Sequence, residues 1–534
     1  MMDKKTDTLT IREAALQAHV STITIRNWIK SEYLPKNEKG EIPIESFEYF
    51  QQYILGKEKL SARANKLRKD SNEQDFISVD SLLKDDDLEA VSNNYQQALG
   101  ESYRNKEGIF YTPQHIVTDM FADIEMNRNT KFLDPCCGSG NFLIEAMRRG
   151  VAPENIYGYD TDQRAIEIAK YRIKKEFGIA PPNLKVFDFL EQSQLLEQSQ
   201  FKVDLIFTNP PWGKKMFKDI RKKYAKMYQS GNSIDSTALF MAASMPLLNP
   251  NGILAFLVQE AFYNIGAFED IRNKILQKKI LKIKDYGKPF KGLLTKAQAI
   301  TIQNAPSNNT EVIPCVITDK MYYRTSKSFV QNPKKIINFW TNTAEDEVIK
   351  RLFEMPHQTL EDRAKWVLGI VTGNNKKYCK DTPHEGFVPI YRGLDIFKNE
   401  IKEPSTFIAT NFSQMQQVAP MDLYQAEEKI IYRFISSSLC FAYDNKQRLL
   451  LNSANAIVPF DLDINNKQLT QLLNSNILNW LFRKMFSTSK ILRKDLEKLP
   501  IHSAYFAENK TFSEQKYLDF LGIRKNGNSY SVCK

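Results

Sequence analysis

Between residues 132 and 208, short apolar runs alternate with longer stretches in which apolar residues recur every three or four positions. The runs predict strands and the periodic stretches predict helices. The predicted strands cover residues 132–134, 156–159, 184–187 and 203–208. Strands that alternate with helices are typical of an α/β fold with a parallel sheet. Ligands of such sheets bind at the carboxyl ends of the strands.

The same patterning divides the rest of the chain. A fifth strand and a later strand pair extend the predicted α/β domain, which we place at 99–330. Residues 57–98 are polar and charged, which predicts a linker with some helix. The pattern changes after about residue 355, so we assign 355–505 to a second large α+β domain and 506–534 to a tail.

The first 56 residues predict a small helical domain. Helices are expected from Thr10 and over 22–30, with Ser21 as a cap, and a short wing at 40–44 precedes a third helix. This order resembles the helix-turn-helix of excisionase and MerR-type regulators. On that resemblance, a DNA-reading helix would present Thr22, Thr24, Arg26 and Asn27. A protein-interaction module without DNA contact is the alternative.

The turn after the first strand of the sheet is rich in glycine. It runs Asp134-Pro135-Cys136-Cys137-Gly138-Ser139-Gly140 and leads into a helical pattern. Glycines let the backbone approach a nucleotide-like ligand closely, although two glycines are not the full dinucleotide fingerprint. The next strand ends at Asp160, which can accept both ribose hydroxyls. The third ends at Asp188-Phe189, a pair suited to an adenine amino group and ring, with a helix cap as the plainer interpretation of the acid.

The fourth strand is followed by Asn209-Pro210-Pro211-Trp212. Two prolines fix φ and remove two N–H groups. The loop therefore offers two acceptors, the Asn209 amide oxygen and the Pro210 carbonyl, on a stiff frame. A planar aromatic amine would bond both acceptors through its N–H groups and stack on Trp212. A rigid turn is the plainer interpretation, but the glycine loop upstream favours the site.

Together these motifs resemble those of S-adenosylmethionine-dependent amino-methyltransferases, above all the N6-adenine DNA methyltransferases of restriction-modification systems. Their order matches the gamma class, with a target-recognition region last. The resemblance implies a Rossmann-like sheet, S-adenosylmethionine as the cofactor, and an Asn-Pro-Pro-aromatic loop that holds the target adenine. It implies a second aromatic face on the base at Phe290. The implied cofactor-binding residues are Tyr111, Thr112, Asp134, Pro135, Gly138, Gly140, Asp160, Asp188 and Phe189.

Charge and the C-terminal pattern favour double-stranded DNA as the partner. The formal net charge is +11, which favours a polyanion. A cluster of basic residues follows the Asn-Pro-Pro-Trp loop, where a phosphate backbone would pass: Lys214-Lys215, Lys218 and Arg221-Lys222-Lys223. Residues 368–375 and 389–396 resemble the openings of target-recognition regions. A basic amphipathic helix over 477–486 is followed by residues 487–490 and Arg493, which suit phosphates.

The apolar runs and the cysteine and histidine spacing bear on the location of the protein and on metal binding. No apolar run approaches a membrane span and no leader opens the chain, so we expect a cytoplasmic protein without a membrane partner. The cysteines and histidines lack metal-ligand spacing. Without a nuclease motif, any cognate restriction endonuclease is expected to be a separate protein. The alternatives are a protein-glutamine or ribosomal-RNA amino-methyltransferase, and a DNA-binding regulator with an inactive methyltransferase domain.

Overall fold

The computed structural model describes residues 8–18, 22–30, 34–37, 40–50, 88–99, 104, 107–290, 293, 295–308, 310–318, 320–486 and 490–533. Three predicted features lie outside these residues: positions 57–87 of the linker, the Ser21 cap, and the hydroxyls at 487–489. No helix in the described ranges combines the length and the apolar character that crossing a membrane requires.

The N-terminal region folds around its own small core. Helices α1 (Ile11–Gln17), α2 (Thr22–Lys30) and α3 (Ile44–Tyr49) accompany a two-stranded antiparallel pair, β1 (Thr8–Leu9) and β2 (Ile42–Pro43). Thr10 caps α1 through a capping box with Glu13. The predicted wing contains β2. The buried apolar residues are Leu9, Ala14, Ala15, Ile25, Trp28, Leu34, Ile42, Phe47 and Phe50.

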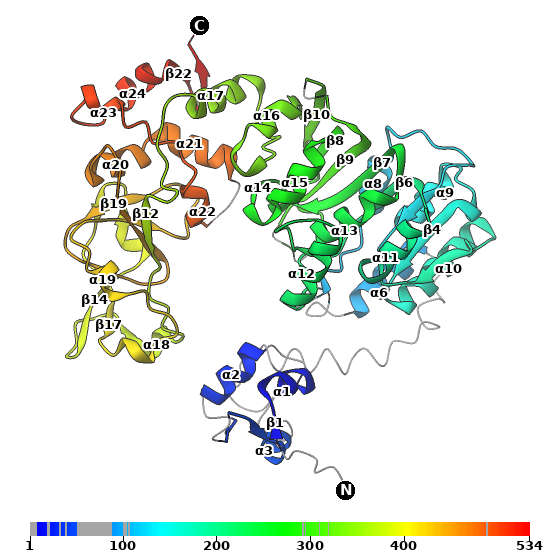
Figure 1. Ribbon diagram of the computed structural model, residues 1–534, viewed down its shortest axis with the longest axis horizontal. Helices are drawn as coiled ribbons and strands as arrows, with labels where there is room; N and C mark the ends of the chain where they lie inside the picture. Colours follow the sequence, from blue (N-terminus) through cyan, green and yellow to red (C-terminus); the bar gives the residue numbers. More distant parts are fainter. Residues whose placement is uncertain are drawn as a thin grey trace.

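A nine-stranded sheet forms the centre of the next domain (Figure 1). Its order is β11-β10-β8-β9-β7-β6-β3-β4-β5. The four strands expected from the pattern are confirmed as β3 (Phe132–Asp134), β4 (Ile156–Asp160), β5 (Asn183–Val186) and β6 (Val203–Thr208). They run parallel with β7 (Leu248–Gln259), whereas β9 (Ala297–Pro306) is antiparallel to both β7 and β8 (Lys278–Asp285). The edge is made by β10 (Val312–Ile317) and β11 (Lys320–Thr325).

The order of these strands places the crevice of the sheet. From β3 the chain moves outward to β4 and β5, then returns to the other side of β3 as β6. Such a reversal is the switch point at which ligands bind, outside the carboxyl ends of the strands. The turns after β3 and β6 therefore flank one crevice, and these are the glycine loop and the Asn-Pro-Pro-Trp loop.

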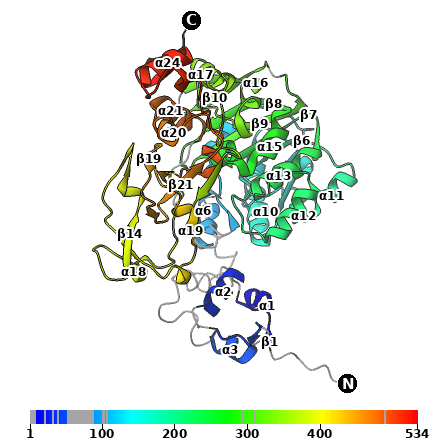
Figure 2. The same ribbon diagram turned by 60° about the vertical axis from the view of Figure 1, so that its left-hand side comes forward.

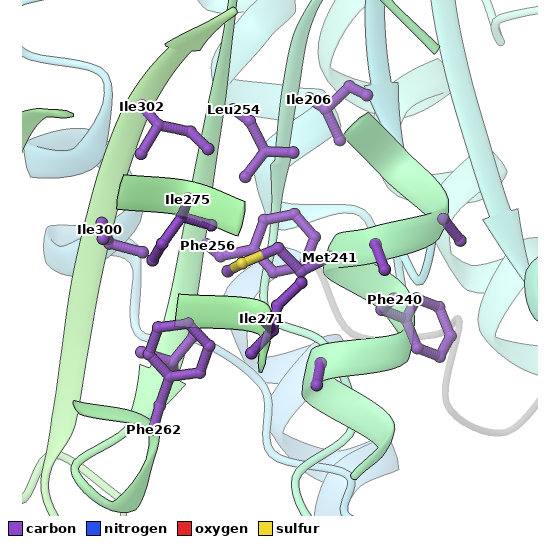
Figure 3. Close-up of a cluster of buried hydrophobic side chains, with 14 of the residues drawn as sticks. Ile206, Phe240, Met241, Leu254, Phe256, Phe262, Ile271, Ile275, Ile300 and Ile302 are labelled. Carbon is purple, nitrogen blue, oxygen red and sulfur yellow. The ribbon is translucent and has the colours of Figure 1, made fainter. Parts of the chain in front are cut away.

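Helices cover both faces of the sheet. They include α8 (Gln114–Met120), α9 (Asn141–Arg148), α10 (Gln163–Phe177), α11 (Phe189–Gln198), α12 (Lys218–Met227), α13 (Ser236–Ser244) and α15 (Glu269–Leu276). Every residue of α13 is buried, and its buried Ser236 and Ser244 hydroxyls donate to the backbone carbonyls of Pro211 and Phe240. Figure 3 shows Met241 of α13 and Ile271 of α15 beside Phe256 of β7, whereas Phe240 projects from the other side of α13.

The C-terminal domain is α+β, as predicted. One antiparallel sheet has the order β12 (Ala364–Val367), β21 (Ala454–Pro459), β18 (Lys429–Arg433), β19 (Phe441–Asp444). A second has the order β13 (Cys379–Lys380), β17 (Phe407–Ala409), β14 (Phe387–Tyr391), β20 (Leu449–Leu450). The main helices are α17 (Thr343–Glu354), α20 (Asn466–Leu473), α21 (Asn476–Met485) and α22 (Arg493–Leu496). Figure 2 shows β14 and α18 (Asn375–Tyr378) toward one end of this domain and α20, α21 toward the other.

The expectation of a tail at 506–534 is wrong. Residues from 514 form α24 (Glu514–Leu521) and a hairpin of β22 (Ile523–Asn526) and β23 (Ser529–Val532). Tyr517, Leu518 and Leu521 are buried in one core with α20 and α21. The polar composition of the segment hides this spacing, which is that of one helical face.

The basic amphipathic helix expected over 477–486 is α21. Its apolar face lies in the domain core. Lys484 forms an ion pair with Glu345 at 2.7 Å, and its carbonyl accepts from Trp340 Nε1 at 2.9 Å. Arg483 is exposed. The helix therefore mainly joins α17 to the C-terminal core.

Candidate active site

Asp134 lies at the end of β3 and is fully buried. Its Oδ1 atom accepts hydrogen bonds from the Cys136 backbone at 3.1 Å and from Thr208 Oγ1 at 2.6 Å. Because Thr208 ends β6, this contact joins the two strands that flank the crevice. Burial raises the pKa of Asp134 to about 7, while the two hydrogen bonds oppose that rise.

The glycine loop needs its glycines for two separate reasons. Gly138 and Gly140 have φ of +50° and +88°, where other residues are strained. A Cβ at Gly138 would also lie 2.9 Å from the Tyr111 ring, and one at Gly140 would lie 3.1 Å from the Ala169 Cβ. Gly140 is the residue before α9, so the loop leads directly into that helix.

Asp160 fixes the shape of the same loop. Its Oδ2 accepts from the Gly138 backbone N–H and its Oδ1 from that of Asp162, both at 2.9 Å. Each carboxylate oxygen keeps a lone pair for a further donor. Burial raises the pKa of Asp160, and the two backbone hydrogen bonds counteract it. Asp162 in turn caps α10 and accepts from the Tyr95 hydroxyl.

The predicted pair at the end of β5 takes two different positions. Asp188 is exposed and caps α11 by accepting from Glu191 N at 3.1 Å, so the helix-cap interpretation describes its contact here. Phe189 is buried and stacks on Phe240 with centroids 5.7 Å apart. Both residues still line the crevice.

These loops enclose a cavity of about 330 Å³. Its wall combines the turns after β3, β4, β5 and β6 with the segment 107–112. The wall includes most of the residues predicted for the site: Tyr111, Thr112, Asp134, Pro135, Gly138, Asp160, Asp188, Phe189, Asn209 and Pro211. Gly140, Pro210, Trp212 and Phe290 do not belong to this lining.

Asn209 has one satisfied and one unsatisfied polar atom. Its Nδ2 donates to the Phe110 carbonyl at 2.7 Å. If the amide were turned by 180°, Asn209 Oδ1 would face the Phe110 carbonyl oxygen, and two acceptors would repel each other. Asn209 Oδ1 is buried and has no hydrogen-bond partner within the described residues. A buried acceptor without a donor costs about 1–3 kcal/mol, which is typical of a position that receives a ligand's N–H.

The rest of the Asn-Pro-Pro-Trp loop is held by three hydrogen bonds. The Pro211 carbonyl accepts from Ser236 Oγ at 2.6 Å. The Trp212 backbone N–H donates to Gly108 O, and its indole Nε1 to Leu257 O, both at 3.2 Å. The indole is buried and meets Phe290 edge to face, with centroids 5.3 Å apart and planes at 84°. Trp212 and Phe290 therefore form an edge-to-face pair in this structure, without the gap that a base between two parallel rings would need.

Sequence reasoning missed several residues of this site. Phe110 supplies the carbonyl for Asn209, and the centroid of its ring lies 6.3 Å from that of Trp212 and 5.7 Å from that of Phe290. Thr208 and Ser236 act through hydrogen bonds that no spacing signals. Only Phe110 had a sequence signal, since it directly precedes Tyr111 and Thr112, which the family resemblance implies as cofactor-binding residues.

Comparisons with known proteins agree with this architecture. The N-6 DNA Methylase family matches residues 86–283, and the TaqI-like C-terminal specificity domain matches residues 388–501. The chain is 43% identical over 395 residues to Type II methyltransferase M.VspI of Vibrio sp. (strain 343), covering 73% of this chain and 96% of that protein. It is 26% identical over 245 residues to Modification methylase CviBIII of Paramecium bursaria Chlorella virus NC1A, covering 45% and 61%.

Among solved structures, the DrdV–DNA complex is similar with a TM-score of 0.49 at 12% identity, covering 93% of this chain and 70% of that one. The sequence relationships define the class. The chain belongs to the DNA methyltransferases of restriction-modification systems, and it carries a C-terminal recognition region.

Proposed function

We propose that this protein transfers a methyl group from S-adenosylmethionine to N6 of an adenine flipped out of duplex DNA. The role would be protective modification, with a separate endonuclease for the same site. The observation that carries the proposal is the buried, unpartnered Asn209 Oδ1 beside the cavity.

The lining of the cavity supports the assignment of this cofactor. The loop around Gly138 would receive the methionine part, with Tyr111 and Thr112 beside its carboxylate. Asp160 would bond the ribose, and the wall at Asp188-Phe189 would meet the adenine ring. Asp134 offers a buried carboxyl group to a cationic ligand. When bound, the cofactor supplies a strongly electrophilic sulfonium methyl group.

The protein's own contribution is positioning. Asn209 Oδ1 and the Pro210 carbonyl would accept the two N–H groups of the adenine amine. This favours a pyramidal nitrogen with an available lone pair, and orientation then supplies most of the rate. No general base is needed before transfer, since the nitrogen loses its proton afterwards.

Base flipping costs a few kcal/mol. Stacking on an aromatic residue returns about 1–3 kcal/mol per base. Trp212 is the aromatic residue of the loop, and Phe110 and Phe290 extend the apolar surface beside it. A base entering here would have to part the edge-to-face pair of Trp212 and Phe290.

Helix α12 supports a path for the phosphate backbone. Lys218, Lys222 and Lys226 recur every four residues and line a groove of about 590 Å³ with Gln229 and Asn232. Two other members of the predicted cluster are already engaged, because Lys214 pairs with Glu107 and Lys223 with Glu191. We therefore assign phosphate contact to the groove lysines.

The N-terminal domain remains a candidate for separate DNA contact. Arg26 on α2 is exposed, and Thr22 and Thr24 are half-buried. We infer that this helix meets duplex DNA independently of the methylation site. The test measures the affinity of the full-length Arg26→Ala variant for duplex DNA that lacks a methylation site. The inference predicts weaker binding than by the wild-type protein. Unchanged binding would favour the protein-interaction module.

The function is tested by mass spectrometry of nucleosides from DNA incubated with the enzyme and cofactor. N6-methyladenine is the expected product. N4-methylcytosine would overturn the base assignment. That assignment rests on Asn209, because an Asp or Ser at this position would have left cytosine more open as the target. Methyl transfer to protein glutamine or to ribosomal RNA, with unmodified DNA, would favour the alternative substrates.

A further inference from the structure

Among the described residues of the C-terminal domain, Leu394 and Ile435 have the two most exposed large apolar side chains. Leu394 is 71% exposed and Ile435 is 61% exposed. They lie 41 residues apart in sequence, one after β14 and one after β18. Single exposed apolar residues are ordinary, whereas exposed apolar residues gathered on one surface mark a contact site.

Ser453 brings these two loops together. The Gly393 backbone N–H donates to Ser453 Oγ at 3.0 Å, and that of Phe434 donates to Ser453 O at 3.0 Å. A Cβ on Gly393 would lie 2.6 Å from Ser453 O, so the backbones are in close approach. We call the loops at 392–395, 434–438 and 452–453 the Ser453 junction.

The junction is rigidly held. Asp395 accepts from the Arg392 backbone N–H at 2.7 Å, and Arg433 Nε donates to Ile396 O at 2.6 Å. Ile491 N donates to Phe434 O at 2.8 Å. Recognition surfaces need side chains that are fixed before the partner arrives, and these contacts fix the backbones that bear Leu394 and Ile435.

Polar and cationic groups surround the apolar tips. Arg392 donates to Ser405 Oγ at 2.8 Å, and its Nε is buried without a hydrogen-bond partner in the described ranges. Lys490, which forms an isolated bridge with Ile435, is exposed, as is Asn452. This combination suits the major groove of DNA. Apolar side chains can contact thymine methyl groups there, the Asn452 amide can bond base-edge acceptors, and the cations can meet the phosphates on either side.

The junction also lies next to the catalytic domain. Ile491 is two residues before α22, and Lys334 pairs with Asp495 of that helix at 3.4 Å. Figure 1 shows α22 on the side of the C-terminal domain that faces the nine-stranded sheet. A duplex at the junction would therefore also be near the domain that modifies it.

We propose that the Ser453 junction reads base edges of the target site, with Leu394 and Ile435 as specificity-determining contacts to thymine methyl groups. This inference rests on the proposed function, because it requires DNA as substrate. Neither side chain touches the cofactor cavity, so their removal leaves cofactor binding intact.

The test uses the full chain and the site found by sequencing modified bases. Duplexes carry uracil in place of one thymine at a time, which deletes a single methyl group. Wild type should lose about 5-fold or more in kcat/KM at a contacted position. On the unmodified duplex, Leu394→Ala or Ile435→Ala should already show this loss of kcat/KM. Replacing the contacted thymine by uracil should then cause no further loss in that variant.

Phe460→Ala is the matched control. Phe460 is 47% exposed and follows the opposite end of β21 from Ser453, roughly 20 Å away at about 3.3 Å per residue. It should retain wild-type rates and the wild-type uracil effect. Equal uracil effects in Leu394→Ala, Ile435→Ala and wild type would overturn the inference, as would a partner protein or second copy that requires the two side chains. Absence of DNA methylation by wild type would instead reject the proposed function.

Discussion

The side-chain amide of Asn209 donates to the backbone carbonyl of Phe110 at 2.7 Å, across 99 residues of sequence. This bond orients the amide so that Oδ1 is left as an acceptor. It also ties the catalytic loop to the 107–112 segment that lines the cavity. Binding in the cavity and orientation of the amide are therefore mechanically linked.

Gly108 should be essential to that link. A Cβ there would lie 2.5 Å from the Trp212 carbonyl oxygen, at a φ of +72°. Gly108→Ala should reduce methyl transfer at least about tenfold because the loop must move. Gly150→Ala is the matched control, since it has a φ of +95° and open space around its Cβ. Gly150→Ala should lose about 1–2 kcal/mol of stability from backbone strain alone, and Gly108→Ala should lose more because of the added clash. Equal activities of the two variants would reject the link.

Asp160 should have two separable roles. Asp160→Ala removes ligand acceptors and frees the Gly138 and Asp162 N–H groups, so cofactor affinity should fall strongly. Asp160→Asn keeps one oxygen and should give a smaller loss. Calorimetry with S-adenosylmethionine measures both. Unchanged affinity in the alanine variant would show that Asp160 is only a loop acid.

Cofactor affinity should rise with pH through neutrality. The pKa of Asp134 is raised to about 7, so the group is mostly neutral at pH 6 and mostly a carboxylate at pH 8. Only the carboxylate attracts a cation, which predicts about a tenfold gain in affinity over this range. Asp134→Asn should abolish the part of the pH dependence that comes from this group. Identical pH profiles in the two proteins would refute the assignment.

The α12 groove should bind phosphates. Lys222→Ala should weaken DNA binding about equally on all sequences and reduce the slope of log K against log salt by about 1. Lys170→Ala, an exposed lysine on α10, should change neither quantity. A sequence-dependent loss for Lys222→Ala, or an equal loss for Lys170→Ala, would contradict the groove as a phosphate path.

The pattern of apolar residues was enough to place the central strands and the loops that follow them. Strand ends and loop chemistry are local properties, so Asp134, Asp160 and Asn209 could be found from sequence. The aromatic pair of Trp212 and Phe290 could be anticipated but not its edge-to-face geometry.

Long-range partners explain what could not be predicted. Lys484 resembles a free surface cation until Glu345, 139 residues earlier, is brought beside it. Tyr517 belongs to the same core as α17 and α21, although α17 begins more than 170 residues earlier in the chain. For the same reason a cut near residue 350 would divide one core. Exchange of the recognition region between relatives should therefore keep α17 with α21 and α24.

The most direct measurement is a single-turnover assay of Asn209→Ala on its DNA site, with cofactor affinity measured in parallel by calorimetry. Asn209 Oδ1 is proposed to accept from the adenine amine, so transfer should fall by about 10²–10³-fold or more. Cofactor affinity should stay within about twofold of wild type. Transfer within tenfold of wild type, or a loss of cofactor affinity that matches the loss of rate, would contradict the central claim.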